Sequence, residues 1–243
     1  MCELHPATRG FADSDRYERG RPGYPQAAVD TIVRGLELRP GRTVLDLAAG
    51  TGKLTRLLAP SGANVIAVEP VREMREKLTG FLALAGTAEH IPLTDAFVDA
   101  VTVGQAFHWF DAERALREIH RVLRPAGGLA LIWNARDERQ PLQAALSEIL
   151  DRYEGDTPRR NQRDWKSLLA ESGLFERTVR LLFEHVQGVD EQAVVDRVLS
   201  VSFMGSLPEE EQALVEREVR ELARDATELS YMTELYLGFK GSS

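Results

Sequence analysis

The fold is decided by the stretch Thr43-Val44-Leu45-Asp46-Leu47-Ala48-Ala49-Gly50-Thr51-Gly52-Lys53. Its first five residues form a short apolar, β-branched run, which is typical of a buried strand. Small residues and two glycines follow, and residues 53–59 have the apolar spacing of a helix. We therefore expect a strand, a glycine turn and a helix in direct succession.

The same alternation continues to residue 133. Further short apolar runs predict strands, at residues 64–68, 81–85, 100–104 and 129–133. Helices are expected between or before them, at residues 25–38, 71–78 and 111–123, the last with Asp111 as its N-cap. Strands joined by helices form right-handed crossovers and a parallel sheet covered on both faces.

After residue 134 the rhythm changes. Helices are expected at residues 142–153, 165–172, 190–201 and 209–226. Two late strands, at 176–186 and 229–239, would extend the same sheet. We expect an α/β fold: a Rossmann-like, doubly wound, mostly parallel sheet of seven strands, with helices on both faces and an antiparallel edge strand.

The composition excludes several classes of protein. Of the 243 residues, 43% are apolar and 28% charged, which excludes disorder, collagen and a disulfide scaffold. The net charge of −8, without a long basic block, argues against nucleic-acid binding. The single cysteine, Cys2, indicates a reducing compartment. With no signal peptide and no apolar run of membrane-spanning length, we expect a cytoplasmic protein with no membrane partner.

Three known kinds of glycine turn follow a first strand, and the sequence fits them to different degrees. A P-loop requires a first glycine where Leu47 stands and a hydroxyl where Leu54 stands. A dinucleotide site requires G-x-G-x-x-G/A, and Thr55 stands at its last position. An NAD-dependent oxidoreductase is therefore the weaker alternative, which stays open here.

The third kind of glycine turn also accounts for two acidic residues, one before the turn and one after the second strand. Asp46, before the turn, can accept backbone amides of the glycine loop, and Glu69, after the second strand, can accept two ribose hydroxyls. The run Asp46-Leu47-Ala48-Ala49-Gly50-Thr51-Gly52 resembles the first motif of class I S-adenosylmethionine-dependent methyltransferases, with Ala48 in place of the first glycine. A left-handed φ at this position would favour glycine, and alanine is the smallest possible change from it.

The resemblance extends over residues 43–133. It includes Val65-Ile66-Ala67-Val68-Glu69-Pro70, Thr87-Ala88-Glu89-His90-Ile91-Pro92-Leu93, Phe97-Val98-Asp99-Ala100-Val101 and Arg121-Val122-Leu123-Arg124-Pro125-Ala126-Gly127-Gly128. The segments Tyr17-x-x-x-Arg21-Pro22-x-Tyr24-Pro25 and Gln105-Ala106-Phe107-His108-Trp109-Phe110-Asp111 resemble the small-molecule branch, with the trans-aconitate and ubiquinone/menaquinone-biosynthesis methyltransferases.

The resemblance implies S-adenosylmethionine as the cofactor and assigns its contacts. These are Tyr17, Arg21, Asp46, Ala48, Gly50, Gly52, Glu69, Pro70, Met74, Ala88, Glu89 and Gln105. The glycine loop and Gln105 would lie along the methionine part, and Glu69 would bind the ribose. Pro70, Met74 and the Ala88 amide would contact the adenine, with Glu89 nearby and Thr87 where the family often has an Asp. Tyr17 and Arg21 would form a lid.

Because the late helices and strands most simply complete the same sheet, we expect one domain over residues 1–243. Residues 1–38 would form the N-terminal lid and helix, and residues 43–133 the cofactor-binding core. Residues 134–183 would be a substrate-covering insertion leading into the sixth strand, and residues 184–243 the C-terminal helices and last strand.

The expected reaction is an in-line methyl transfer to an oxygen, nitrogen or carbon atom of a small molecule. His108 is the only one of the five histidines in the loop after the fourth strand, and is the candidate general base. That loop lacks the Asn-Pro-Pro-Tyr-like segment of enzymes that methylate nucleobases or Gln side chains. A non-catalytic cofactor-binding protein is the other alternative, and no metal ligand is assigned.

Arginines are frequent in the predicted lid and cover: Arg16, Arg19, Arg21, Arg136, Arg139, Arg159, Arg160 and Arg163. They could bind a carboxylate-bearing acceptor or form a solvated face with acidic partners, and the second interpretation is favoured.

Overall fold

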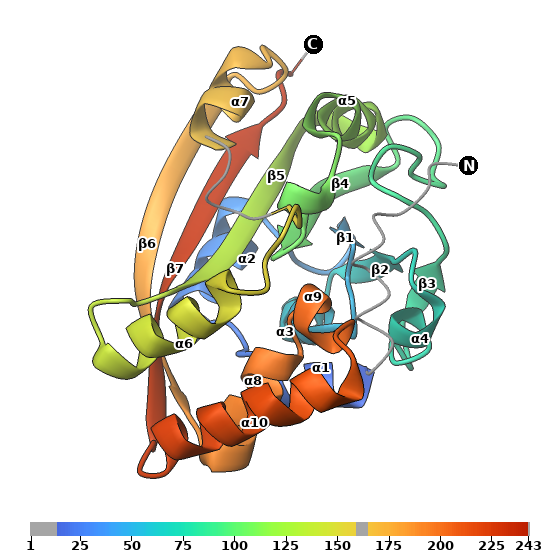
Figure 1. Ribbon diagram of the computed structural model, residues 1–243. Helices are drawn as coiled ribbons and strands as arrows, with labels where there is room; N and C mark the ends of the chain where they lie inside the picture. The colour runs from blue at the N-terminus through green and yellow to red at the C-terminus, as the bar shows by residue number, and fades with distance from the viewer. Residues whose placement is uncertain (1–13, 159–164, 243) are drawn as a thin grey trace. The chain divides into compact units, whose positions relative to one another are not determined.

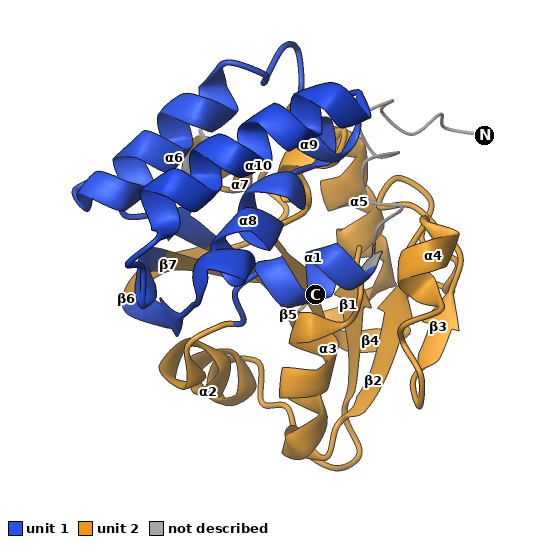
Figure 2. Cartoon of the chain, turned by 60° about the horizontal axis from the view of Figure 1, so that its bottom comes forward, with its two compact units in different colours: residues 1–23, 134–157, 184–232 blue, residues 24–133, 158–183, 233–243 orange. Residues whose placement is uncertain are grey.

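The computed structural model describes residues 14–158 and 165–242. The chain divides into two compact units (Figure 2): unit 1 comprises residues 1–23, 134–157 and 184–232, and unit 2 comprises 24–133, 158–183 and 233–243. Cys2, Arg159, Arg160 and Arg163 lie outside the described residues. Each unit has a hydrophobic core of its own. The expectation of a single domain stays a prediction.

Seven strands form one mixed sheet in the order β3-β2-β1-β4-β5-β7-β6 (Figure 1). They are β1 (Thr43–Leu47), β2 (Asn64–Val68), β3 (Leu82–Leu84), β4 (Val98–Gly104), β5 (Leu123–Arg136), β6 (Arg177–Gly188) and β7 (Glu228–Phe239). The first five are parallel. The Lys240 amide donates to Gly127 and the Glu176 amide to Phe239, so the end of β7 meets the starts of β5 and β6. The mostly parallel seven-stranded sheet with an antiparallel edge is confirmed.

Helices cover both faces of the sheet in unit 2. They are α2 (Gln26–Gly35), α3 (Lys53–Leu58), α4 (Arg72–Arg75), α5 (Ala112–Val122) and α7 (Trp165–Glu171), with 3-10 turns η2 (Ala59–Ser61) and η3 (Phe107–Trp109). Because strand side chains alternate between faces, Val44 packs with α2 and α3, whereas Leu45 packs with α5 and α7. This arrangement confirms the doubly wound fold. Asp111 caps α5 by accepting the Arg114 amide at 3.2 Å, as predicted.

The helix expected at residues 71–78 is shorter than predicted. It ends at Arg75, after which Lys77 and Leu78 bond to carbonyls three residues back, and Gly80 adopts a left-handed φ of 85°. Tighter i to i−3 bonds commonly close a helix end.

Unit 1 is built mainly from helices: α1 (Ser14–Gly20), α6 (Pro141–Asp151), α8 (Glu191–Leu199), α9 (Ser202–Gly205) and α10 (Glu209–Ala223). Its core joins α6, α8, α9 and α10 to the start of β7. The sequence did not predict α1 and α9, which are short. Helix α1 packs so closely on α8 that a Cβ at Gly20 would lie 2.4 Å from the Asp196 carbonyl.

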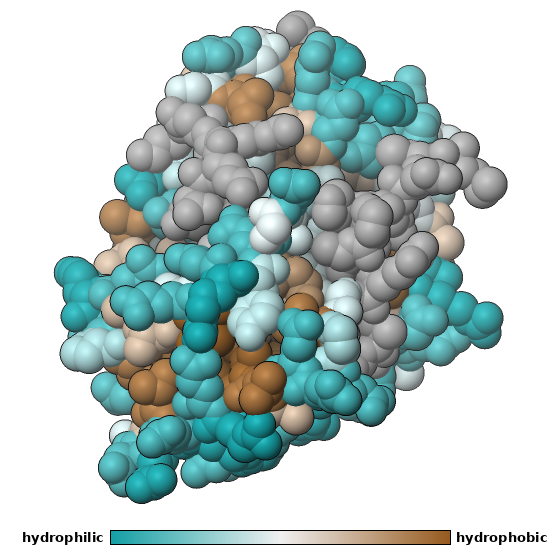
Figure 3. Space-filling view, viewed as in Figure 1, coloured by the Kyte–Doolittle hydropathy of each residue, from teal (hydrophilic) through white to brown (hydrophobic). Residues whose placement is uncertain are grey.

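The surface agrees with the many polar and charged residues of the sequence (Figure 3). On the face shown in Figure 3, hydrophilic residues predominate and hydrophobic ones lie in patches among them. Within residues 14–158 and 165–242, no helix has both the length and the apolar character needed to cross a bilayer.

Candidate functional site

The order of the strands in the sheet reverses between β1 and β4. Strand β1 pairs with β2 on one side and β4 on the other, so the strand order reverses there. In open α/β sheets, ligands bind outside the carboxyl ends of the strands at such a point. Residues from the loops after β1, β2 and β4 therefore define the candidate site in unit 2.

The loop after β1 has a left-handed backbone at three alternate positions. The φ angles are 55° at Ala48, 58° at Gly50 and 90° at Gly52. Only glycine adopts this conformation freely, and an alanine in it costs about 1 kcal/mol. A Cβ at Gly52 would lie 2.6 Å from Leu78 Cδ2, so this glycine also permits close packing. Ala48 therefore adopts the left-handed backbone although it is not a glycine.

Glu69 holds the glycine loop. Its Oε2 accepts the Gly50 amide and its Oε1 the Val71 amide, both at 2.8 Å. Arg75 donates to the Glu69 carbonyl at 2.7 Å and to the Pro70 carbonyl at 3.2 Å, which fixes the turn behind the carboxylate. A carboxylate has about four lone-pair positions, so both oxygens can still accept a ribose hydroxyl.

Burial perturbs the acidity of Glu69. The side chain is 4% exposed, and desolvation raises its pKa from 4.5 to about 7. The Val71 and Gly50 amides and the Arg75 charge oppose this rise, while Asp46 adds to it. A carboxyl that titrates near neutrality in a ligand-binding loop is typical of a functional site.

Asp46 has different partners from those expected. Its carboxylate accepts the Thr55 hydroxyl at 2.6 Å and the Thr102 hydroxyl at 3.0 Å. It also accepts a hydrogen bond from the backbone amide of Thr55 in α3, whereas the Gly50 amide of the loop donates to Glu69. The expectation that Asp46 binds the loop amides was therefore wrong. It joins β1, α3 and β4 instead, and burial raises its pKa to about 6.

Sequence reasoning missed Thr55 and Thr102 as parts of this site. Thr55 was considered only as a mismatch to the dinucleotide motif. Thr102 is the direct register partner of Asp46 across β1 and β4. That pairing depends on strand register, for which the sequence holds no local signal.

The residues predicted to contact adenine follow β2 and β3: Pro70 and Met74 come after β2, with Met74 in α4, and Ala88 comes after β3. Met74 is 4% exposed, and its sulfur lies 3.8 Å from where a Gly50 Cβ would be. Ala88 is buried beside this edge of the core, and the Thr87 hydroxyl is buried with no hydrogen-bond partner among the described residues. Glu89 accepts the Asp111 amide at 3.0 Å and so supports the start of α5.

The loop after β4 brings Gln105 and His108 to the same edge of the sheet. Gln105 has a φ of 59° and is, like Ala48, a strained position of the site. Its backbone amide donates to the Ile132 carbonyl at 2.9 Å. A Cβ at Gly104 would lie 2.6 Å from the Tyr24 hydroxyl, so Tyr24, which was not assigned, also reaches this edge.

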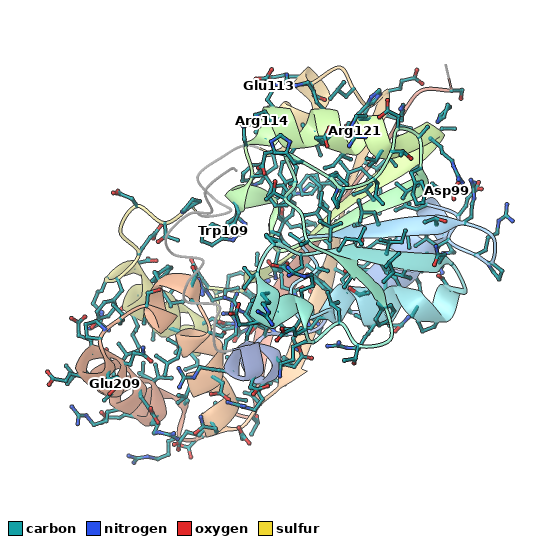
Figure 4. All side chains as sticks on the ribbon, turned by 90° about the vertical axis from the view of Figure 1, so that its right-hand side faces the viewer. Asp99, Trp109, Glu113, Arg114, Arg121 and Glu209 are labelled. Carbon is teal, nitrogen blue, oxygen red and sulfur yellow. The ribbon has the colours of Figure 1, made fainter. Side chains whose placement is uncertain are left out.

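Aromatic residues flank His108 in η3, which comprises Phe107–Trp109. Its ring lies 5.4 Å from that of Trp109, and the preceding Phe107 is fully buried. In Figure 4, Trp109 lies far from Asp99, which marks the amino end of β4. The structure thus places His108 and Trp109 beyond the carboxyl end of β4, at the edge that carries the glycine loop.

The predicted lid residues belong to unit 1. The Arg21 guanidinium lies 5.1 Å from the Tyr17 ring centroid, and its Nη2 donates to the Ser200 carbonyl at 3.0 Å. The assignment of both residues to the cofactor stays a prediction. Among the other predicted lid and cover arginines, Arg19 pairs with Asp196 and Arg139 with Asp137, both at 2.7 Å, which favours the solvated-face interpretation.

The doubly wound sheet, the glycine loop after β1 and the acid after β2 together define a class I S-adenosylmethionine-dependent methyltransferase. The family described as "Methyltransferase domain" matches residues 45–131. An uncharacterized methyltransferase of Mycobacterium tuberculosis is 46% identical over 177 residues, which are 66% of this chain and 71% of that protein. An uncharacterized methyltransferase-like protein of Schizosaccharomyces pombe is 38% identical over 214 residues, 86% of this chain and 83% of that protein.

A solved structure agrees in fold. The YcgJ protein of Bacillus subtilis has a TM-score of 0.60 at 19% identity and covers 90% of this chain and 100% of its own. The chain belongs to the methyltransferase family and is a methyltransferase that uses S-adenosylmethionine. The NAD-dependent oxidoreductase and the non-catalytic binding protein are thereby set aside.

Proposed function

We propose that the protein methylates a small organic molecule, with S-adenosylmethionine bound at the carboxyl ends of β1, β2 and β4. The observation that carries this proposal is the pair of hydrogen bonds that the Glu69 carboxylate accepts from the Gly50 and Val71 amides. The residues present fit the cofactor, because the loop is left-handed at three positions and the buried Thr87 hydroxyl has an unused bonding position.

Each part of the cofactor has proposed partners in unit 2. Ala48, Gly50, Gly52 and Gln105 would lie along the methionine part, and the free lone pairs of Glu69 would accept the ribose hydroxyls. Pro70 and Met74 would pack on the adenine, and the Ala88 amide would donate to a ring nitrogen. The Thr87 hydroxyl would accept a hydrogen bond from the exocyclic amine of the adenine. The family often has an Asp at this position.

The bound cofactor supplies a methyl group already activated on a sulfonium, so the protein mainly aligns the acceptor and excludes water. His108 is proposed to accept a proton from an acceptor hydroxyl or amine. The aromatic side chains of η3 suit a small organic acceptor, and the net charge of −8 disfavours nucleic acid. Tyr17 and Arg21 are proposed to cover the cofactor.

Thermal unfolding with S-adenosylmethionine, S-adenosylhomocysteine and NAD tests the cofactor assignment. A ligand at 100 times its Kd stabilises the folded protein by about 2.7 kcal/mol, so the first two should raise the Tm and NAD should not. Glu69→Gln should weaken this response, whereas Glu73→Gln, at an exposed position of α4, should not. Stabilisation by NAD alone would contradict the proposal.

The acceptor class needs an activity assay. Release of S-adenosylhomocysteine is followed with a panel of small hydroxy, amino and carboxylic compounds, and separately with DNA, RNA and protein. Turnover only with small molecules is expected. Turnover only with a macromolecule would refute the proposed acceptor class and leave the cofactor assignment standing.

A further inference from the structure

Unit 1 contains a buried arginine without an anionic partner. Arg197 lies in α8 and is only 7% exposed. Its Nε donates to the Tyr231 hydroxyl at 3.3 Å, a long hydrogen bond, and its Nη1 is buried without a hydrogen-bond partner among the described residues. Within the part of the chain that the structure describes, no carboxylate forms an ion pair with Arg197.

The nearest acid in the sequence is already engaged. Asp196 pairs with Arg19 at 2.7 Å and with Arg16 at 3.8 Å, both in α1. Successive residues of a helix point about 100° apart, so Asp196 faces α1 while Arg197 faces β7. The Asp196 carboxylate therefore forms its ion pairs with arginines of α1 and not with Arg197.

The hydrogen bonds that lead from the guanidinium reach uncharged side chains. Tyr231 donates its hydroxyl to Gln187 Oε1 at 3.3 Å, and its ring lies 6.0 Å from that of His185. Burial lowers the pKa of His185 and so disfavours a positive charge on its imidazole. An uncompensated buried cation costs several kcal/mol, and proteins normally balance it with an anion.

We propose that Arg197, with Tyr231 beside it, forms a binding site for a small organic carboxylate. One positive charge is balanced by a monoanion such as a carboxylate, whereas the dianionic form of phosphate, which is abundant near neutral pH, carries one charge more than a single guanidinium. A planar carboxylate also matches the donors of a guanidinium, which are arranged as a fork. The proposal rests on unit 1 alone and does not depend on the proposed methyl transfer.

The test compares carboxylates with their uncharged amides. Acetate and benzoate, with acetamide and benzamide as controls, are titrated at constant ionic strength, with calorimetry and thermal unfolding as readouts. The wild-type protein should bind the carboxylates saturably and not the amides. Arg197→Met should weaken carboxylate binding at least about tenfold, since a hydrogen bond to a charged group contributes about 1.5–3 kcal/mol.

Two further variants separate binding from folding. Arg217→Met, at an exposed position of α10, should bind carboxylates as the wild type does. In carboxylate-free buffer, Arg197→Met should have an unchanged or higher Tm, because methionine removes an unbalanced buried charge. If it fails to fold, Arg197→Lys is used, which keeps the charge but lacks the fork and should bind carboxylates more weakly.

Three results would overturn the proposal: no saturable binding of any carboxylate to the wild-type protein, equal binding of phosphate and carboxylate, or unchanged carboxylate binding in the Arg197 variant that folds. Stabilisation by S-adenosylhomocysteine is measured on the same samples. It should be unchanged in Arg197→Met, so the failure of this site and the failure of the cofactor site give different results.

Discussion

The raised pKa of Glu69 predicts that cofactor binding depends on pH. The carboxylate must be ionised to accept the Gly50 and Val71 amides and two ribose hydroxyls together, and in the free protein its pKa is about 7. The ionised fraction of an acid grows as the pH rises, so affinity for S-adenosylhomocysteine should rise through neutral pH and level off above it.

The size of the effect follows from the titration of one group. With a pKa of about 7, about one carboxyl in eleven is ionised at pH 6 and about ten in eleven at pH 8. If the bound state holds Glu69 ionised at both pH values, the Kd should be about tenfold lower at pH 8, a difference of about 1.4 kcal/mol. Calorimetry in buffers of different ionisation enthalpy should show release of one proton near pH 6 and almost none at pH 8.

Variants decide whether Glu69 is the group that titrates. Glu69→Gln should bind about ten to a hundred times more weakly at pH 8, because its amide nitrogen cannot accept a backbone amide, and its affinity should not change with pH. Glu73→Gln should keep the wild-type pH dependence. A wild-type affinity that is constant between pH 6 and pH 8, or a pH dependence that survives in Glu69→Gln, would refute the reasoning.

Four further outcomes are expected. Thr55→Val removes the hydroxyl that donates to Asp46 at 2.6 Å and should lower the free energy of unfolding in urea by about 1.5–3 kcal/mol, whereas Thr55→Ser should cost less; equal losses would contradict this. Ala48→Gly should relieve the φ of 55° and raise the stability by about 1 kcal/mol, seen as a Tm increase of about 2–4 °C; a fall in Tm would count against the strain. Thr87→Val removes a buried hydroxyl without a described partner, so it should leave the Tm unchanged or higher while weakening S-adenosylhomocysteine binding about tenfold in calorimetry; unchanged affinity would exclude the adenine contact. His108→Ala should lower kcat by about 10²–10⁴-fold in a small-molecule methylation assay without changing cofactor affinity, and unchanged turnover would remove His108 as the general base.

The local elements were predictable where the sequence carries a strong local signal. Strands β1 and β2 have the bounds that their apolar runs predicted, and Asp111 caps α5 as expected. The glycine loop was predictable because its motif, Asp46 to Gly52, is a run of consecutive residues between a strand and a helix. The missed helices α1 and α9 are short, and short helices depend on packing rather than on propensity.

The sequence by itself determined the class of fold, the glycine loop and the two acids beside it, since each depends on neighbouring residues and on alternation along the chain. The tertiary structure alone decided what those acids do. The register of β1 and β4 pairs Thr102 with Asp46. The loops after β1 and β2 lie close enough for the Gly50 amide to donate to Glu69. It also decided that Arg197 is buried while Asp196 pairs with α1. Such contacts join residues far apart in the chain, and their burial, which sets the pKa of Glu69 and Asp46, exists only once the elements have packed.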